Sequence, residues 1–276
     1  MNFRIPFATL VLFAFAPAAS AQYIFFPIDA TINSTISGNA IVGYANFEGL
    51  DFGSYPTSPT INVVSGSFIT GELSAYNSST VNVSGGVTGY LTTQTNSTAN
   101  VSGGLITRSL TAYNSSVVNV SGGIINNGLY AFNSSVVNIS GGVINYYLRA
   151  NSGTINVSGG TINSGLYSNN GGTLNVSGGA LTDLIAYGDG TINIFGTGLT
   201  SALINPSARG AYSEYALSGA LSSGDSLSGI EVFVQNGTGA QFSLINTTVT
   251  PEPGSFALLV GLSTVGASVL RKRRKG

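Results

Sequence analysis

The chain has 276 residues, of which 43% are hydrophobic and only 7% are charged, and it contains no Cys, His or Trp. Thiol chemistry, zinc sites built on Cys or His, disulfides and any Ser-His catalytic mechanism are therefore excluded. Residues 22–250 carry nine acidic and three basic side chains, a net charge of −6, so this body offers no basic surface for nucleic acid.

The first 21 residues have the pattern of a secretory signal peptide. Arg4 supplies a positive start, and residues 7–16 form a short apolar run. A small-residue triplet, Ala-Ser-Ala, then ends at Ala21. We expect cleavage between Ala21 and Gln22 and export of the remaining chain.

The central part, residues 61–197, is a repeat in which Asn-Val-Ser-Gly-Gly or a near match recurs every 18 to 20 residues. The leading asparagines are Asn62, Asn82, Asn100, Asn119, Asn138, Asn156, Asn175 and Asn193. Apolar residues flank each of them, an alternation that predicts a strand with Asn pointing outward. The two glycines that follow permit a sharp corner.

A second apolar stretch in the repeat ends on a leucine ten residues after the asparagine, as at Leu110, Leu129, Leu148 and Leu166. A second turn is expected near Asn77, Asn96, Asn114, Asn133, Asn151 and Asp189, because Asn and Asp tolerate the left-handed conformation. Each repeat thus predicts two or three short strands and no helix.

A repeat this short cannot bury its own apolar face, but it can when equivalent strands stack at about 4.8 Å. We therefore predict an all-β fold, a parallel and right-handed β-helix (β-solenoid) of about eight coils. An antiparallel β-sandwich is the alternative. Residues 22–60 are expected to form an irregular first coil and N-terminal cap. Residues 198–249 lose the period but keep apolar-polar alternation, which predicts a C-terminal β cap.

Residues 250–276 form a separate tail with three parts in order. Pro251, Glu252 and Pro253 come first, and the apolar residues 256–270 follow. As a helix this segment would cover roughly 23 Å, which is short for a membrane core of about 30 Å. The chain then carries the basic cluster Arg271, Lys272, Arg273, Arg274 and Lys275, expected to stay on the cytoplasmic side.

These three parts resemble the PEP-CTERM sorting tail of Gram-negative bacteria, although Thr250 stands where many members have Val. The resemblance implies recognition by an exosortase, a membrane-embedded processing enzyme, after transient anchoring in the inner membrane. It also implies removal of the tail near Pro251-Glu252-Pro253 and delivery to the cell surface or extracellular matrix, often with exopolysaccharide. A plain, unprocessed anchor is the alternative. The repeats are loosely similar to those of autotransporter passenger domains.

The outward asparagines are the first candidate binding residues. Stacked amides can hydrogen-bond to one another along a solenoid, and this structural role is the one we favour over a glycan-binding polar face. The Asn-x-Ser triplets also match the N-glycosylation acceptor, which we interpret as a by-product of the repeat.

Four aromatic residues just before the second turn, Tyr76, Tyr113, Phe132 and Tyr187, are the candidate glycan contacts. Aromatic residues at equivalent positions most often stack as part of the fold, whereas an exposed row could bind sugar rings.

A catalytic site is not expected. Glycoside hydrolysis usually needs two carboxylates across the scissile bond, and Asp183 and Asp189 share a coil, but Asp189 occupies a turn position. No metal site or cofactor is predicted. The sequence therefore favours a non-enzymatic, exported surface or matrix protein associated with exopolysaccharide. A glycan-binding adhesin is the second hypothesis and a polysaccharide-acting enzyme the third.

Overall fold

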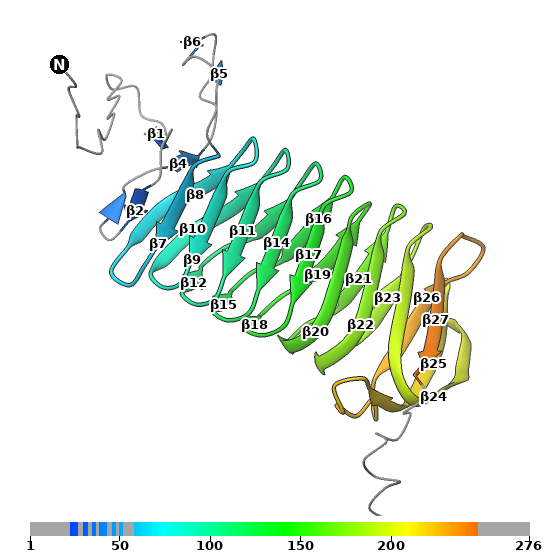
Figure 1. Ribbon diagram of the computed structural model, residues 1–276. Helices are drawn as coiled ribbons and strands as arrows, with labels where there is room; N and C mark the ends of the chain where they lie inside the picture. The colour runs from blue at the N-terminus through cyan, green and yellow to red at the C-terminus, as the bar shows by residue number, and fades with distance from the viewer. Residues whose placement is uncertain are drawn as a thin grey trace, which may run out of the picture. The chain divides into compact units, whose positions relative to one another are not determined.

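The computed structural model describes residues 58–247 and six short strands between residues 23 and 51. Its first compact unit, residues 1–246, contains a parallel β-solenoid of about 7 turns. Figure 1 shows its coils side by side from β7 to β24. The predicted all-β solenoid is thus confirmed. Its handedness stays a prediction.

Each coil contributes strands to three parallel stacks. The asparagine stack contains β2 (Ala30–Ile32), β7 (Thr60–Val63), β9 (Thr80–Val83), β11 (Thr98–Val101), β14 (Val117–Val120), β17 (Val136–Ile139), the starts of β20 (Thr154–Ile162), β22 (Thr173–Ala180) and β24 (Thr191–Ala208), and β27 (Gln241–Asn246).

The short stack contains β3 (Thr35–Ile36), the starts of β8 (Phe68–Ala75) and β10 (Val87–Thr93), β12 (Leu105–Ile106), β15 (Ile124–Ile125), β18 (Val143–Ile144) and the ends of β20 and β22.

The leucine stack contains β1 (Tyr23–Phe26), β4 (Asn39–Val42), the ends of β8 and β10, β13 (Leu110–Ala112), β16 (Leu129–Phe132), β19 (Leu148–Asn151), β21 (Leu166–Asn169), β23 (Leu184–Ala186) and β26 (Glu231–Gln235). Separately, β5 (Asn46–Phe47) and β6 (Leu50–Asp51) pair as an antiparallel hairpin.

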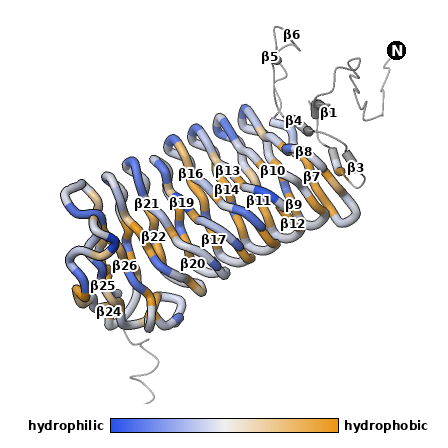
Figure 2. Tube along the Cα trace, turned by 180° about the vertical axis from the view of Figure 1, so that it is seen from behind, coloured by the Kyte–Doolittle hydropathy of each residue, from blue (hydrophilic) through white to orange (hydrophobic). Residues whose placement is uncertain are grey.

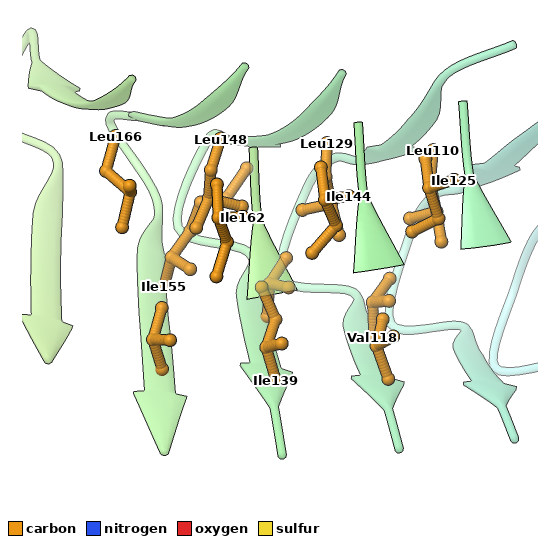
Figure 3. Packing of buried hydrophobic residues seen from close by; sticks show 14 of the residues in the cluster. Leu110, Val118, Ile125, Leu129, Ile139, Ile144, Leu148, Ile155, Ile162 and Leu166 are labelled. Carbon is orange, nitrogen blue, oxygen red and sulfur yellow. The ribbon is translucent and has the colours of Figure 1, made fainter. Parts of the chain in front are cut away.

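The core lies between the stacks and is made of identical positions in successive coils. In the coil that starts at β14, Val118, Val120, Ile125, Leu129 and Ala131 all have exposed fractions of 1% or less. Figure 3 shows such side chains pointing into the space between strands, and in Figure 2 the hydrophobic segments of neighbouring coils line up. Since each coil buries its apolar side chains against the next, the period itself builds the core.

The corner after the asparagine stack depends on its two glycines. A Cβ on Gly122 would lie 2.4 Å from the backbone oxygen of Ser102 in the preceding coil, and one on Gly123 would lie 2.7 Å from the oxygen of Gly103. Gly123 also has φ = 80°. The repeated Gly-Gly pair therefore lets adjacent turns stack backbone against backbone.

The second corner is a tight turn with two successive positive φ angles, the signature of a type I′ turn. Asn114 (φ = 50°) and Ser115 (φ = 60°) occupy its centre, and Ser116 N–H donates to Tyr113 O across it at 3.1 Å. The prediction of which turn residue adopts the left-handed conformation is wrong in two coils. Ser152 has positive φ in place of Asn151, and Gly188 has positive φ in place of Asp189.

Ser115→Gly is expected to stabilise the solenoid by about 0.5 kcal/mol, because glycine removes the side-chain cost of the left-handed conformation. The neighbouring Ser116→Gly should destabilise it, since Ser116 Oγ is buried and donates to Thr93 O at 3.2 Å. Urea unfolding of the full chain in mild detergent checks both. Equal shifts in one direction would contradict this account.

The C-terminal end of the solenoid closes with strands that leave the repeat. β24 continues past the last repeat and pairs antiparallel with β25 (Tyr212–Leu221), which pairs antiparallel with β26. β26 and β27 then add in parallel to the leucine and asparagine stacks. The hairpin of β24 and β25 brings Ala208 and Tyr212 against Phe233 and Ile185 in a second hydrophobic cluster.

Asp225 ties the loop after β25 to the repeats. Its carboxylate accepts hydrogen bonds from Ser223 Oγ at 2.7 Å and from Gly179 N–H at 2.8 Å. These bonds, the hydroxyl first, lower the pKa of Asp225 below its ordinary 3.8. A carboxyl with a lowered folded-state pKa stabilises the fold above its unfolded pKa, and this contribution is lost as pH falls through the folded value.

Asp225→Asn is therefore expected to lower the free energy of unfolding at pH 7 but to have little effect below the folded-state pKa of Asp225. The same denaturant titration on wild type and variant at pH 7 and at progressively more acidic pH measures the difference. A difference that persists unchanged after Asp225 is protonated would show that charge is not the cause.

Several predicted features lie outside the described residues. They are the signal cleavage site Ala21–Gln22, the motif Pro251–Pro253, the apolar segment 256–270 and the basic cluster 271–275. Among the residues that are described, no helix is long and apolar enough to cross a membrane.

Candidate functional site: the outer face of the leucine stack

The asparagine side chains form a continuous hydrogen-bonded ladder on the outer face of their stack. Each Nδ2 donates to Oδ1 of the preceding coil at 2.8–2.9 Å, from Asn82 onto Asn62 through to Asn193 onto Asn175. The predicted role of these amides, bonding to one another, is present in every coil of this ladder. Its amides are therefore committed to the fold.

Asn138→Asp should cost about 1–2 kcal/mol at pH 7, because the carboxylate cannot donate to Asn119 Oδ1 as Asn138 Nδ2 does. Facing an acceptor, the new carboxyl has a raised folded-state pKa, so the penalty shrinks as pH falls through that pKa. Denaturant unfolding at pH 7 and pH 3 measures this. Asn145→Asp, in the exposed ladder between Asn126 and Asn163, is the control and should cost less.

The predicted aromatic row does not present free ring faces throughout. The rings of Tyr113 and Phe132 stack on one another, with centroids 4.9 Å apart and an interplanar angle of 12°. Tyr187 packs against the hydrophobic cluster of Ile185, Ala208 and Phe233. The stacking of Tyr113 on Phe132 is what we expected of aromatic residues at equivalent positions, whereas Tyr187 belongs to the hydrophobic cluster. Tyr76 occupies the first position of its turn, where its carbonyl accepts from Ser79 N–H.

A different set of residues lies on the outer face of the leucine stack, two residues before the aromatic row along each strand. Residues that follow the buried leucines point outward, and the strand register aligns Tyr130, Arg149 and Tyr167 on adjacent strands β16, β19 and β21. Arg149 Cζ lies 5.2 Å from the ring centroid of Tyr167 and 5.9 Å from that of Tyr147. We call Tyr147, Arg149, Tyr167, Asp183 and Arg209 the tyrosine–arginine cluster.

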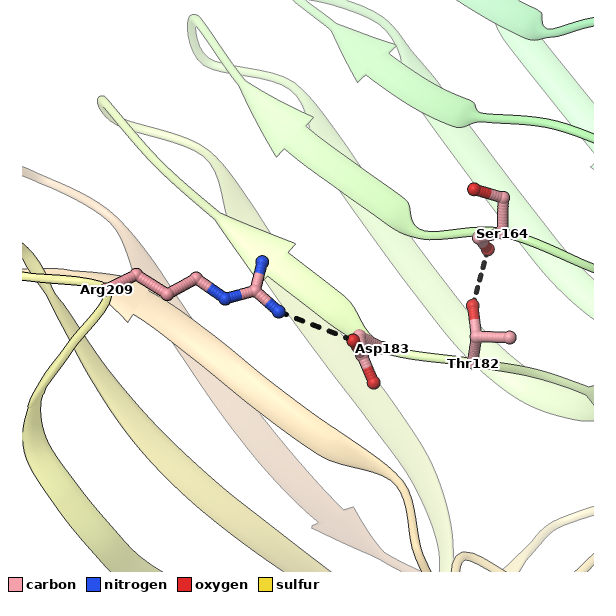
Figure 4. Close-up of polar contacts among 4 residues, drawn as sticks. All are labelled: Ser164, Thr182, Asp183 and Arg209. Atoms are coloured by element: carbon pink, nitrogen blue, oxygen red, sulfur yellow. Dashed lines mark hydrogen bonds and ion pairs between the residues drawn. The ribbon is translucent and has the colours of Figure 1, made fainter.

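Two backbone features position these side chains. Gly165 leaves room for the ring of Tyr167, whose Cε2 lies 2.8 Å from where a Cβ would stand. The turn that carries Asp183 is held to the preceding coil by hydrogen bonds from Thr182 Oγ1 to Ser164 O and from Leu166 N to Asp183 O. Figure 4 shows this turn and the ion pair of Arg209 Nη2 with Asp183 Oδ2, 3.6 Å apart.

The cluster combines opposite charges with a partly buried phenol, the side chain of Tyr167. Burial raises the pKa of Tyr167, and Tyr147 raises it further, while Arg149 and Arg209 act in the opposite direction. Glu231 lies close by. Its pKa is raised by burial first and then by the negative charges of Glu214 and Asp183. The cap thus brings two glutamates near Asp183. Nothing local in the sequence indicates this proximity, because the residues are far apart along the chain.

Asp183 and Asp189, the two acids of one coil, have different surroundings. Asp183 pairs with Arg209, whereas Asp189 Oδ1 accepts a hydrogen bond from Gly171 N–H at 2.6 Å in the turn. Asp189 therefore acts as a turn residue, as expected from its position. Within the described part of the chain, no group of three or more acidic side chains has the geometry to hold a metal ion.

Two polar atoms on this face have no hydrogen-bond partner although they are buried. They are Nε of Arg149, a donor, and Oδ1 of Asn169, an acceptor. Asn169 is 4% exposed and follows Tyr167 by two residues, so both side chains lie on the same face of β21.

Comparison with known proteins finds no family model, no curated protein and no solved structure that matches this chain.

Proposed function

We propose that this protein is a non-enzymatic, exported β-solenoid of the cell surface or extracellular matrix that associates with exopolysaccharide. The observation that supports a structural role is the asparagine ladder. Its amides bond to one another in coil after coil, so the regular face stiffens the solenoid and leaves few free groups for chemistry.

Delivery is the second part of the proposal and is supported by sequence. The pattern around Ala21 and Gln22 is that of a signal peptide, and Pro251–Pro253 with the basic residues 271–275 resembles the PEP-CTERM tail. An exosortase would process the chain while residues 256–270 lie in the inner membrane. The body, with few basic residues of its own, would then be released to the surface of a Gram-negative bacterium.

Mass spectrometry of the protein recovered from the cell surface tests delivery. We expect a mature chain that begins at Gln22 and ends near Pro251–Pro253. A surface-exposed chain that retains Arg271–Lys275 would contradict processing, and a chain retained in the cytoplasm with residues 1–21 would contradict export. A variant in which Pro251, Glu252 and Pro253 are all Ala is the control and should accumulate unprocessed.

The absence of catalysis is tested with a panel of polysaccharides and a reducing-end assay on the full chain. We expect no turnover. Turnover that Asp183→Ala abolishes would establish the enzyme hypothesis instead.

A glycan-binding adhesin is the second candidate, and one observation favours it. The tyrosine–arginine cluster places aromatic rings, cations and a carboxylate on one face of adjacent strands, which is a set of groups suited to sugar recognition. In this second candidate function, the glycan binds at the tyrosine–arginine cluster and not along the repeated asparagine face.

A further inference from the structure

We propose that the outer face of β19, β21 and β23 is a binding site for a neutral polysaccharide, with the tyrosine–arginine cluster and Asn169 as its contacts. This inference rests on the proposed association with polysaccharide and assigns it to particular residues. It differs from the aromatic row before the second turn, where the rings of Tyr113 and Phe132 cover one another.

The unpartnered atoms are the first argument. Leaving a buried polar group without a partner is unfavourable, and such groups in a folded protein call for an explanation. Here a donor, Arg149 Nε, and an acceptor, Asn169 Oδ1, are both unpartnered on neighbouring strands. Sugar hydroxyls both donate and accept, so a saccharide on this face carries the kind of partner that each of these atoms lacks.

The rings are the second argument. Tyr147 and Tyr167 meet edge to face, with centroids 5.2 Å apart and an interplanar angle of 88°. The two rings are thus nearly perpendicular and form a corner, unlike the flat stack of Tyr113 and Phe132. The C–H face of a pyranose gains dispersion contacts on such rings, while its hydroxyls face Arg149.

Charge selects the class of polysaccharide. Arg209 pairs with Asp183, and Arg149 lies over the ring of Tyr167. Glu214 and Asp183 are close enough to Glu231 for their negative charges to raise its pKa further, after burial. Carboxylates therefore outnumber cations at this end of the face. A polyanion would be repelled by the carboxylates, whereas a neutral hexose chain can bond to carboxylate, guanidinium and amide alike.

Affinity electrophoresis of the full chain in mild nonionic detergent tests the site. The gels contain hydroxyethyl cellulose or yeast mannan as neutral probes, or alginate as a polyanion. We expect wild type to be retarded by at least one neutral probe and not by alginate. Tyr167→Ala and Arg149→Ala should each weaken that binding by about tenfold or more, whereas Tyr167→Phe, which keeps the ring, should retain most of it.

The chain offers a matched control in an earlier coil. Arg108 lies over the ring of Tyr90 at 5.2 Å and its Nη1 donates to Tyr90 Oη at 3.2 Å, so Tyr90→Ala and Arg108→Ala remove an arginine–tyrosine pair of similar geometry outside the cluster. They should bind as wild type does. Gly165→Ala, which displaces the Tyr167 ring without deleting it, should weaken binding while circular dichroism shows an intact solenoid.

The outcomes separate this inference from the proposed function. Wild-type retardation that Tyr167→Ala and Arg149→Ala leave unchanged overturns the site but leaves polysaccharide association standing. Retardation by alginate alone overturns the selection for neutral chains. Absence of retardation with every probe, together with no exopolysaccharide in the surface fraction that contains the protein, overturns both.

Discussion

Gly122→Ala is expected to destabilise the solenoid by about 3 kcal/mol, the upper range for forcing extra volume into a packed site. The added methyl would stand 2.4 Å from Ser102 O and 3.0 Å from its carbonyl carbon. Both are backbone atoms of the preceding coil, so no side-chain rotation relieves the contact. The two coils must separate, which weakens the parallel pairing of β11 with β14.

Gly237→Ala is the control for this prediction. Gly237 has φ = 71° and no neighbouring atom within 4 Å of its would-be Cβ, so the change adds only backbone strain of about 1 kcal/mol. Chemical denaturation of the full chain in mild detergent compares the two. If Gly237→Ala costs as much as Gly122→Ala, contact between stacked turns does not explain the glycine pair.

Leu148→Ala is expected to cost about 3–5 kcal/mol, the range for emptying a fully buried leucine site. Leu148 is 0% exposed and lies in register between Leu129 and Leu166. In a solenoid each coil contacts only its neighbours, so the cavity also uncouples the coils on its two sides. We therefore expect a broader unfolding transition as well as a lower midpoint.

Leu203→Ala provides the comparison for this second prediction. Leu203 is 54% exposed on the outer part of β24, and its loss should change stability by less than about 0.5 kcal/mol. Limited proteolysis in increasing denaturant reports both midpoint and breadth. Indistinguishable profiles for the two variants would mean that the leucine stack is not the core that holds the coils together.

The repeated part of the fold could be predicted from sequence because each coil uses the same positions for the same task. The apolar-polar alternation around Asn119 predicts the strand of the asparagine stack. The two glycines after it predict the first corner, and the leucine ten residues further on predicts a core position. The C-terminal end could not be predicted in detail. The pairings of β24 with β25 and of β23 with β26 do not recur in other coils, so the repeat period of the sequence does not predict them.

The candidate site could be predicted only in part for the same reason. Arg149 and Tyr167 occupy a position that varies between coils, which a search for recurring residues passes over. Aligning the chain on the buried leucines would have placed them side by side. Glu214, Glu231 and Arg209 approach Asp183 only because the non-repeating cap folds onto the last coils, and nothing local in the sequence indicates this.

The direction of the asparagine ladder gives the solenoid an electrical polarity. Every Nδ2 from Asn82 to Asn193 donates toward the N-terminal end, so seven amide dipoles are aligned along one axis. Reversing one amide would set two donors or two acceptors face to face, so the orientation is cooperative, and hydrogen bonds in such chains polarise one another. The C-terminal end of the ladder is thus its negative pole, and lengthening the protein by whole coils would extend this dipole without adding a single charged residue.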